Sequence, residues 1–446
     1  MTRVWFGWWL GLAACATPAD LKVNAPEALA LAAETNSASA PNVSLTEPLL
    51  LATEREARAT RETLAVVARA HELEVLRPVA NELVSRDRGI ALIIEKTNRD
   101  VPRAVLDAQG EMLAALELMP SDYPFVDGLF AMVKANIAGF YDPHDHTMYL
   151  LDDLDDASRG PTLSHELVHA LQDQHFDLGG RLTYRPGEAD VLAATSSFAE
   201  GDATAAMFAG PDGTASPLSA DTLRLSMSMA VAFSATGLST PPVLQASLVA
   251  PYVDGYRFVS ALRERGGWAE VNRVWRDPPR STEQVLHLEK YDAHEAPLVV
   301  APPGFAALGP GWRLLDSDVS GEQALRLALE QWFSPPEAVR AAAGWGGDRY
   351  ALVGRDVEGG REIALAWHVR FDDAKEAIEA ETLLMPKFAP CRVRSPEGPI
   401  AVKRKGADLG IVAGPFLRSS AGKALARPDA SCKEARRWLD EVLRQP

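Results

Sequence analysis

The chain has 446 residues, of which 47% are hydrophobic and 24% are charged, the balance of a globular protein with two or three folded units. This composition excludes disorder over most of the length. The formal net charge is -16. An acidic surface repels phosphate backbones, and the sequence has no long run of Lys and Arg, so we expect no nucleic-acid partner.

Residues 1–14 have the pattern of a secretory signal peptide. Arg3 supplies a positive start, and the run VWFGWWLGLAA that follows is apolar. This run is too short to span a bilayer as a permanent helix, which needs roughly 20 residues. The sequence therefore predicts an exported protein.

The signal ends in the tetrapeptide LAAC, which resembles the bacterial lipobox, in which the cysteine is lipidated and becomes the mature N-terminus. Lipidation of Cys15 would anchor the chain to a membrane of the bacterial cell envelope, and Ala16 after it favours the outer membrane. The residues that follow are rich in Ala, Pro, Ser, Asn and Thr, so we expect 15–49 to comprise the lipidated cysteine and a flexible tether. The alternative is an ordinary signal peptide with an incidental cysteine.

Helical patterns dominate the next part of the chain. TEREARATRETLAVVARAHELEVL, PVANELVSRDRGIALIIEK, RAVLDAQGEMLAALELM and PFVDGLFAMVKANI each place apolar residues at helical spacing. The following stretch, IAGFYDPHDHTMYLLDD at 137–153, predicts two short strands around a polar turn. The first third of the folded chain is therefore expected to be mostly helical and to end in a hairpin.

The run GPTLSHELVHALQDQHFDLGG predicts a helix that starts at Gly160-Pro161 and ends at Gly179-Gly180. A second helix is expected at roughly 188–208, and 240–300 is again helical. Near the end, ALVGRDVEGGREIALAWHVRF predicts a hairpin and DDAKEAIEAETLL a helix. We therefore expect an α+β fold that is predominantly α-helical, with a mostly helical domain at 50–336 and a small α/β region at 337–446.

Two further cysteines, Cys391 and Cys432, lie in the C-terminal region. Export to an oxidising compartment favours a disulfide between them, and two buried free thiols are the alternative. Neither has the neighbouring Cys or His that a metal site requires.

His165 and His169 are four residues apart on the predicted helix and therefore project from one face, one turn apart. Both imidazoles can then reach one zinc ion, and Glu166 beside them can serve as general base, which is the HExxH arrangement of zinc peptidases. Leu163, Leu167 and Leu171 would anchor the other face in the core. A helix that carries two histidines by accident is the alternative.

A catalytic zinc site has three protein ligands and one open position. The pattern HExxHxxGxxH, which would supply a third histidine, is incomplete, because Gln172 stands at its glycine position. His175 lies six residues beyond His169, but no glycine is available to bend the helix and turn His175 back to the metal. A glutamate on the following helix is the other common solution, and Glu200 in SSFAEGDATAA meets it, with Glu188 and Asp202 as alternatives. The neighbours that would let this helix approach closely are Ala193, Ser196, Ser197 and Thr204.

A ligating imidazole usually donates its second N–H to an acceptor. Asp173 lies one turn past His169 on the same face and is a candidate for this acceptor. A surface role for Asp173 is the alternative.

HELVH with the downstream Glu200 resembles the gluzincin type of zinc metallopeptidase. HELVHALQDQHF, FAEGDATA, PYVDGYRFV, STEQVLHLEKY and GWGGDRY resemble, more narrowly, a poorly characterised family of bacterial and archaeal metalloproteases. The resemblance covers about 137–351, and Leu288 departs from the proline that is frequent in that family. It implies a zincin-like catalytic core in which a short edge-strand hairpin precedes the HExxH helix.

The resemblance also implies two features of substrate binding. An extended substrate would pair with the edge strand, which is either Ala138 to Asp142 or Met148 to Leu151. A side chain from a later segment would stabilise the oxyanion, and each candidate also has a structural interpretation. The candidates for this donor are Tyr252, Tyr256, His287 and Tyr291. His144 and His146, in the turn between the strands, are interpreted as exposed loop residues rather than as a second metal site.

These observations predict zinc-dependent hydrolysis of peptide bonds in peptide or protein substrates by a membrane-anchored exported lipoprotein. Zn²⁺ would be held by His165, His169 and Glu200, and Glu166 would activate the attacking water. The alternative function is that of a non-catalytic envelope lipoprotein, in which the HExxH helix binds metal or is only structural. A zinc hydrolase of a non-peptide amide is a further alternative.

Overall fold

The structure is a computed structural model that describes residues 47–209, 218–388, 390–427 and 431–444. The expected signal peptide, Cys15 and most of the expected tether lie outside these residues. Helix α1 begins at Glu47, so residues 47–49 of the expected tether are helical. Within the described ranges, no helix combines the length and apolar composition that crossing a membrane requires.

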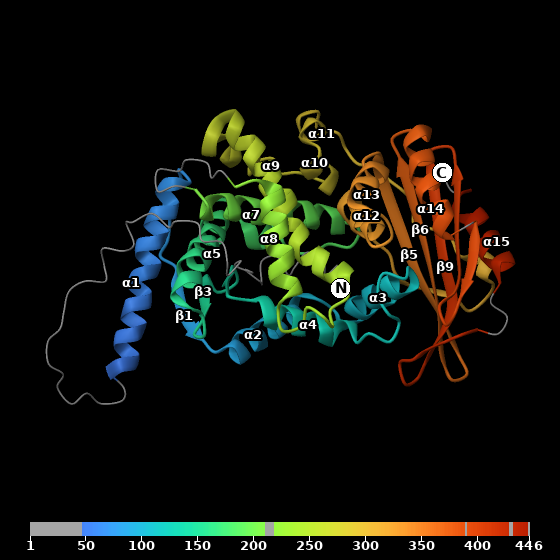
Figure 1. Ribbon diagram of the computed structural model, residues 1–446, viewed down its shortest axis with the longest axis horizontal. Helices are drawn as coiled ribbons and strands as arrows, with labels where there is room; N and C mark the ends of the chain where they lie inside the picture. Colours follow the sequence, from blue (N-terminus) through green and yellow to red (C-terminus); the bar gives the residue numbers. More distant parts are fainter. Residues whose placement is uncertain (1–46, 210–217, 389, 428–430, 445–446) are drawn as a thin grey trace.

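The fold is mixed α+β and mostly helical, as the sequence predicts, with a small mixed sheet and a C-terminal antiparallel sheet. Figure 1 shows α1 and the C-terminal sheet at opposite ends of the long axis. The helical part comprises α1 (Glu47–Ala70), β1 (Ala80–Val84), α2 (Arg86–Asp100), α3 (Arg103–Ala115), α4 (Phe125–Asn136), β2 (Gly139–Asp142), β3 (Thr147–Leu151), α5 (Asp156–Phe176), α6 (Leu178–Arg181), α7 (Ala189–Met207), α8 (Ala220–Ala232), α9 (Pro242–Val274), α10 (Thr282–Leu286) and α11 (Leu288–Asp292). The C-terminal part comprises η3 (Ala306–Leu308), β4 (Arg313–Asp316), α12 (Gly321–Glu330), α13 (Pro335–Ala342), β5 (Trp345–Val357), β6 (Gly360–Phe371), α14 (Ala374–Phe388), β7 (Cys391–Arg394), β8 (Gly398–Lys405), β9 (Asp408–Ser419), β10 (Ala424–Leu425) and α15 (Cys432–Val442).

The small sheet has the strand order β1-β3-β2. The hairpin expected at 137–153 is confirmed as β2 and β3, which pair antiparallel, and β1 joins β3 on its other side in parallel. Since β3 is paired along both edges, the segment 148–151 is excluded as the strand that receives a substrate. β2 is the edge strand next to α5.

The prediction of helix throughout 78–96 is wrong at its start, where β1 forms. Ser85 then caps α2, because its hydroxyl accepts the backbone N–H of Arg88 at 3.3 Å. Residues 80–84 form a strand because they pair in parallel with β3, in which Ala80 lies opposite Thr147, about 67 residues further along the chain. Local periodicity carries no signal for such a pairing.

The predicted start of the HExxH helix is also wrong. α5 begins at Asp156, and the Asp155 carboxylate accepts the N–H of Ser158 at 2.8 Å. The helix therefore starts at this cap and continues through Pro161. The proline removes only one intrahelical hydrogen bond, near the start of the helix. At the other end, Asp177 takes a left-handed conformation (φ 56°) and closes the helix.

The C-terminal sheet has the strand order β4-β5-β6-β9-β8-β7, with β10 paired to β9. The hairpin β5–β6 and helix α14 occur where the sequence predicts them. Successive side chains of each strand point to opposite faces of this sheet. One face packs with α14 in the main core, and the other face packs with α15 in a separate core that contains Trp438. β4 precedes residue 337, so the sheet extends across the boundary expected at 336/337.

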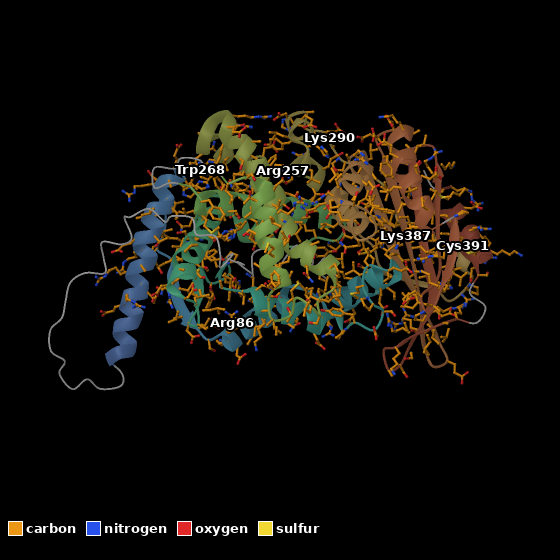
Figure 2. The ribbon with its side chains drawn as sticks, in the orientation of Figure 1. Arg86, Arg257, Trp268, Lys290, Lys387 and Cys391 are labelled. Carbon is orange, nitrogen blue, oxygen red and sulfur yellow. A yellow bond between two sulfur atoms is a disulfide. The ribbon has the colours of Figure 1, made fainter. Side chains whose placement is uncertain are left out.

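Cys391 and Cys432 form a disulfide, which confirms the expected pairing. The bond links the first residue of β7 to the first residue of α15, 41 residues further along the chain. Cys391 lies in the C-terminal part of the molecule (Figure 2). The disulfide therefore ties the last helix to the edge of the sheet.

Reduction of this disulfide is expected to lower the free energy of unfolding by about 4 kcal/mol, because the open chain gains conformational entropy when unfolded. Guanidinium unfolding with and without a phosphine reductant measures the difference. The double variant Cys391→Ser/Cys432→Ser is the control, since its stability should not respond to the reductant. Equal stability of the oxidised and reduced wild-type protein would contradict the expectation.

Candidate metal centre

Helix α5 presents His165 and His169 on its buried side, where each side chain is nearly inaccessible to solvent. Their Nε2 atoms are 3.2 Å apart. The opposite side of α5 is fixed in the main core as the sequence predicts. The leucines that fix it are Leu163, Leu167 and Leu171. Core packing of the helix thus holds the two imidazoles in register.

Helix α7 brings Glu200 to the same point. Its Oε2 atom lies 3.1 Å from Nε2 of His165 and 3.7 Å from Nε2 of His169, and the side chain is fully buried. The structure therefore brings together the three residues that the sequence singles out, and this group could hold a metal ion.

The geometry of this triangle fits zinc. Four N or O ligands at 2.0–2.1 Å in a tetrahedron are separated from one another by about 3.3 Å, and the three observed separations scatter around that value. Glu200 also has a second oxygen, Oε1, that is buried and has no hydrogen-bond partner among the described residues. A buried carboxylate oxygen without a partner is costly unless a cation compensates it.

The two alternative third ligands lie elsewhere. Glu188 precedes α7, and its half-exposed carboxylate is 3.4 Å from Arg185. Asp202 is buried but turned away from the histidines and is occupied by other donors. Of the three acids considered, only Glu200 faces both imidazoles.

Burial and the neighbouring charges shift the pKa values of the three side chains in different directions. Burial lowers the pKa of His165 and keeps its imidazole neutral. Burial acts in the same direction on His169, but the adjacent Glu200 carboxylate overcomes it and raises the pKa to about 9. Burial alone would raise the pKa of Glu200, yet the charge of His169 lowers it. Without metal, the site holds a buried ion pair between His169 and Glu200.

Zinc binding at pH 7 is therefore expected to release about one proton per chain, because a ligating imidazole must be neutral. The proton comes from His169, so zinc affinity should rise with pH up to about 9, the pKa of that imidazole. Titration calorimetry in buffers of different ionisation enthalpy counts the protons. Binding without proton release at pH 7 would show that His169 is already neutral in the metal-free chain.

The second nitrogen of His169 is hydrogen-bonded, as zinc ligands generally require. Its Nδ1–H donates to Oε1 of Gln172 at 2.8 Å. The amide of Gln172 in turn donates to the carbonyl of Ala199 (3.1 Å) and to Oδ2 of Asp202 (2.9 Å), both on α7. Gln172, rather than the expected Asp173, is the acceptor for His169.

Asp202 is the centre of a fully buried network. His71 donates to its Oδ1 at 2.6 Å, and Trp275 donates to its Oδ2 at 2.7 Å, beside the bond from Gln172. The His71 ring is stacked on Trp268 with ring centroids 4.2 Å apart. Residues that follow α1 and α9 are thus linked through Asp202 to a candidate metal ligand.

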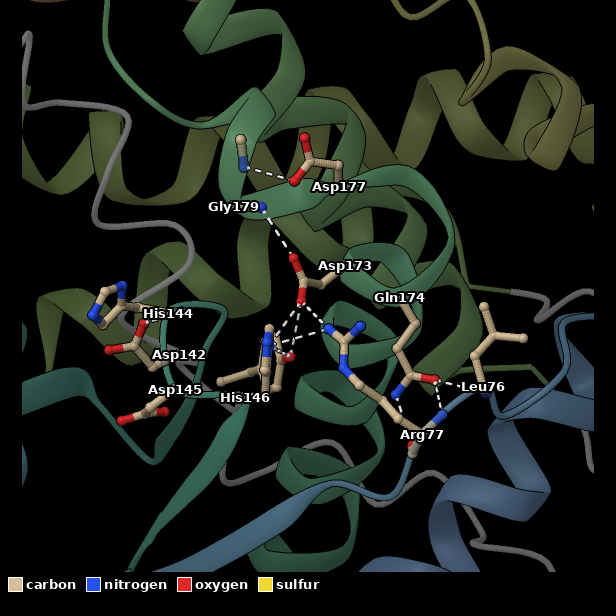
Figure 3. A network of polar contacts seen from close by, with 12 residues as sticks. Leu76, Arg77, Asp142, His144, Asp145, His146, Asp173, Gln174, Asp177 and Gly179 are labelled. Carbon is tan, nitrogen blue, oxygen red and sulfur yellow. Dashed lines mark hydrogen bonds and ion pairs between the residues drawn. The ribbon is translucent and has the colours of Figure 1, made fainter.

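Asp173 takes part in a different network, shown in Figure 3, on the side of α5 that faces the β2–β3 turn. Its carboxylate accepts hydrogen bonds from Arg77 (2.5 Å), from the Tyr141 hydroxyl (3.0 Å) and from the N–H of Gly179 (3.2 Å). Half-exposed His146 lies 3.3 Å from the same carboxylate. Asp173 therefore fixes the edge strand and the end of α5 and does not contact His169.

Glu166 is buried beside the histidines and is oriented by the edge strand. The backbone N–H of Tyr141, on β2, donates to Oε2 of Glu166 at 2.9 Å. This N–H points away from β3, which places the carboxylate along the outer edge of β2. The residue expected to be the general base thus lies between the histidine pair and the edge strand.

A close crossing of α7 and α9 sets the position of Glu200. A Cβ added to Gly201 would lie 2.0 Å from the backbone of Gly255, and one added to Gly255 would lie 1.7 Å from the carbonyl of Ser197. Only two glycines permit this contact. The close approach expected of the helix that carries Glu200 is therefore present, and the helix that it contacts is α9.

The candidates for an oxyanion donor are separated by the structure. Tyr252, on α9, lies near the site, with its ring centroid 5.9 Å from that of His165. The Tyr256 hydroxyl donates to the carbonyl of Leu218, and the Tyr291 hydroxyl donates to that of Asp277. His287 donates to Glu322 at 2.8 Å. The structure brings only Tyr252 of these four next to the three potential ligands.

The later sequence motifs make hydrogen bonds between elements of the fold. In STEQ, the hydroxyl of Thr282 donates to Asp190 on α7 at 2.6 Å. In GWGGDRY, Asp348 accepts the backbone N–H groups of Ser320 and Gly321 at the start of α12. These side chains have structural partners.

Comparisons with known proteins concern the C-terminal part alone. A family model described as "Domain of unknown function (DUF8575)" matches residues 312–418, which run from β4 to all but the last residue of β9. No curated protein and no solved structure matches the chain. The matched segment leaves His165, His169 and Glu200 outside it.

Proposed function

We propose that this chain is a zinc-dependent peptidase of the gluzincin type, with His165, His169 and Glu200 as the metal ligands. The observation that carries the proposal is the convergence of three ligand atoms beside a carboxylate that an edge strand orients. A bound zinc ion would polarise the scissile carbonyl and lower the pKa of a water molecule next to it.

The chain's own residues perform the remaining steps. An extended peptide pairs with the outer edge of β2, which directs its carbonyl towards the histidine pair. Glu166 removes a proton from the attacking water and delivers it to the leaving amine nitrogen as the C–N bond breaks. The N–H of Tyr141 keeps the Glu166 carboxylate aimed at that water. We assign Tyr252 as the donor to the developing oxyanion, because its ring lies next to that of His165.

We further propose that the protein acts on peptides or proteins at the bacterial cell envelope, anchored through lipidated Cys15, with the outer membrane as its location. The support is the signal pattern of residues 1–14 and the LAAC tetrapeptide. The disulfide between Cys391 and Cys432 is compatible with an oxidising compartment. Mass spectrometry of the mature N-terminus distinguishes a lipidated cysteine from an ordinary signal-peptidase product.

The purified chain is expected to contain about one zinc ion and to cleave casein or members of a peptide library. Removal of zinc with 1,10-phenanthroline should abolish cleavage, and added Zn²⁺ should restore it. The variant Glu200→Gln is expected to lose zinc and activity together, because a neutral amide is a poor zinc ligand.

One observation favours the non-catalytic alternative. His165, Glu166, His169 and Glu200 are each at most 2% exposed, as in structural metal sites that substrate does not enter. Stoichiometric zinc without cleavage of any peptide in the library would support that alternative and contradict the peptidase.

A further inference from the structure

Helix α8 and the turn after it present large apolar side chains to solvent. The first three are spaced by four residues and therefore lie along one side of the helix. We call this set the α8 face, and it consists of Leu225 (64% exposed), Met229 (50%), Phe233 (83%) and Leu238 (104%). The last two are among the most exposed large apolar residues of the described chain.

The fold does not need these side chains. α8 packs on α9 through its opposite side, on which Leu223, Met227 and Val231 are 1–2% exposed. Figure 1 shows α8 beside α9, near the middle of the view. Because the buried side already anchors the helix, the exposed side is available for a partner.

The α8 face lies in a long stretch without charge. No Asp, Glu, Lys or Arg occurs between Arg224 and Asp254, in a chain whose residues are 24% charged. A contiguous apolar surface on a folded protein marks a contact with another apolar phase or molecule. Protein–protein interfaces surround their apolar centre with charged and hydrogen-bonding groups. Along this stretch of the sequence the α8 face has charged groups at one end only, and the exposed polar groups beside it are small hydroxyls such as those of Ser228 and Ser239.

That end carries two arginines. Arg224 and Arg257 are half-exposed, and both approach Asp221, at 3.7 Å and 3.5 Å. Figure 2 labels Arg257 on the α8–α9 side of the molecule. A helix that lies in a bilayer surface with its apolar side down has this arrangement, because guanidinium groups at its end reach the lipid phosphates.

We propose that the α8 face docks onto the surface of a phospholipid bilayer, with Phe233 and Leu238 inserted among the acyl chains. A fluid bilayer accepts protruding side chains of any shape, whereas a protein partner needs a matching groove. Since the chain as a whole is acidic, with a net charge of -16, insertion of apolar groups rather than net charge drives the contact. This docking is independent of peptidase activity.

Sedimentation of the full chain with phosphatidylcholine vesicles, with and without phosphatidylglycerol, tests the proposal. The double variant Phe233→Ser/Leu238→Ser is expected to lower the partition coefficient about tenfold or more, because two large apolar groups no longer enter the bilayer. The effect should persist at high salt. The N-terminal segment is common to both chains, so the ratio of their coefficients isolates the α8 face.

The matched control is Leu76→Ser/Val299→Ser, which removes two exposed apolar residues (57% and 91% exposed) from other surfaces. It should change the partition coefficient less than about twofold. Hydrogen exchange of the full chain should show slower exchange at 233–239 on vesicles than in solution. Equal partitioning of wild type and F233S/L238S would overturn the proposal. Self-association that F233S/L238S abolishes would also overturn it, in favour of a second copy of the chain as the partner.

Discussion

The Glu166→Gln variant is expected to keep zinc bound and to hydrolyse peptides about 10²–10⁴ times more slowly, because an amide cannot take a proton from water. The substitution changes little else. Gln has the same shape as Glu. Its side-chain oxygen can still accept the N–H of Tyr141, which lies 2.9 Å from the Glu166 carboxylate in the unsubstituted protein. The loss should therefore appear in kcat rather than in KM or in the thermal stability. Steady-state kinetics on a cleaved library peptide, with zinc analysis of the same sample, measures it.

The control is Glu188→Gln, which makes the same chemical change at a half-exposed carboxylate just before α7. Its kinetics should match the wild type. Undiminished hydrolysis by E166Q would show that another group activates the water. Loss of zinc from E166Q would show instead that the Glu166 carboxylate contributes to metal binding.

Local geometry explains why the sequence predicts the centre of the site. The four-residue spacing of His165 and His169 fixes their common face as soon as a helix forms, and core leucines on the other face fix the helix. Glu200 is predictable for a related reason, because, apart from Asp190 and Asp202, it is an acid on a helix composed of small and apolar residues. Such an acid is buried with the helix and needs a cationic partner.

The residues around the ligands are not predictable in this way. His71 follows α1 and meets Asp202 across 131 positions of sequence, and Trp275 follows α9. No periodicity relates such positions. The choice between Gln172 and Asp173 shows the same limit, since both are one turn from His169 and flank it on the helical wheel. The position of α7 decides it, because Asp202 lies on the Gln172 side.

The two errors in secondary structure have the same origin. β1 has a sequence compatible with helix, and its parallel pairing with β3 makes it a strand. Proline disfavours the interior of a helix, which is why a helix start is expected at Pro161. The Asp155 cap starts α5 earlier, and the packed helix tolerates the proline near its first turn. In both cases a contact outside the local pattern outweighs the pattern.

The Asp202→Asn variant is expected to destabilise the fold by about 3–5 kcal/mol and to weaken zinc binding about 10–100-fold. The carboxylate accepts from three buried donors, on His71, Gln172 and Trp275. An asparagine amide has an acceptor oxygen on one side only and an NH₂ donor group on the other, so its NH₂ group faces at least one of these donors. If Gln172 turns away, His169 loses the acceptor that orients its ring. Denaturant unfolding and a competitive zinc titration measure the two effects.

The control variant Asp190→Asn separates the expected loss of stability from the expected loss of zinc affinity. Asp190 is a buried carboxylate on the same helix, and it binds Thr282 but is not part of the chain of hydrogen bonds to His169. Its replacement should lower stability while leaving zinc affinity within about twofold of wild type, since nothing that holds the imidazole is altered. An Asp202→Asn protein that is destabilised yet binds zinc as tightly as wild type would contradict the positioning role. In that case the network would hold α1, α7 and α9 together, and His169 would keep its orientation from the packing of α5 alone.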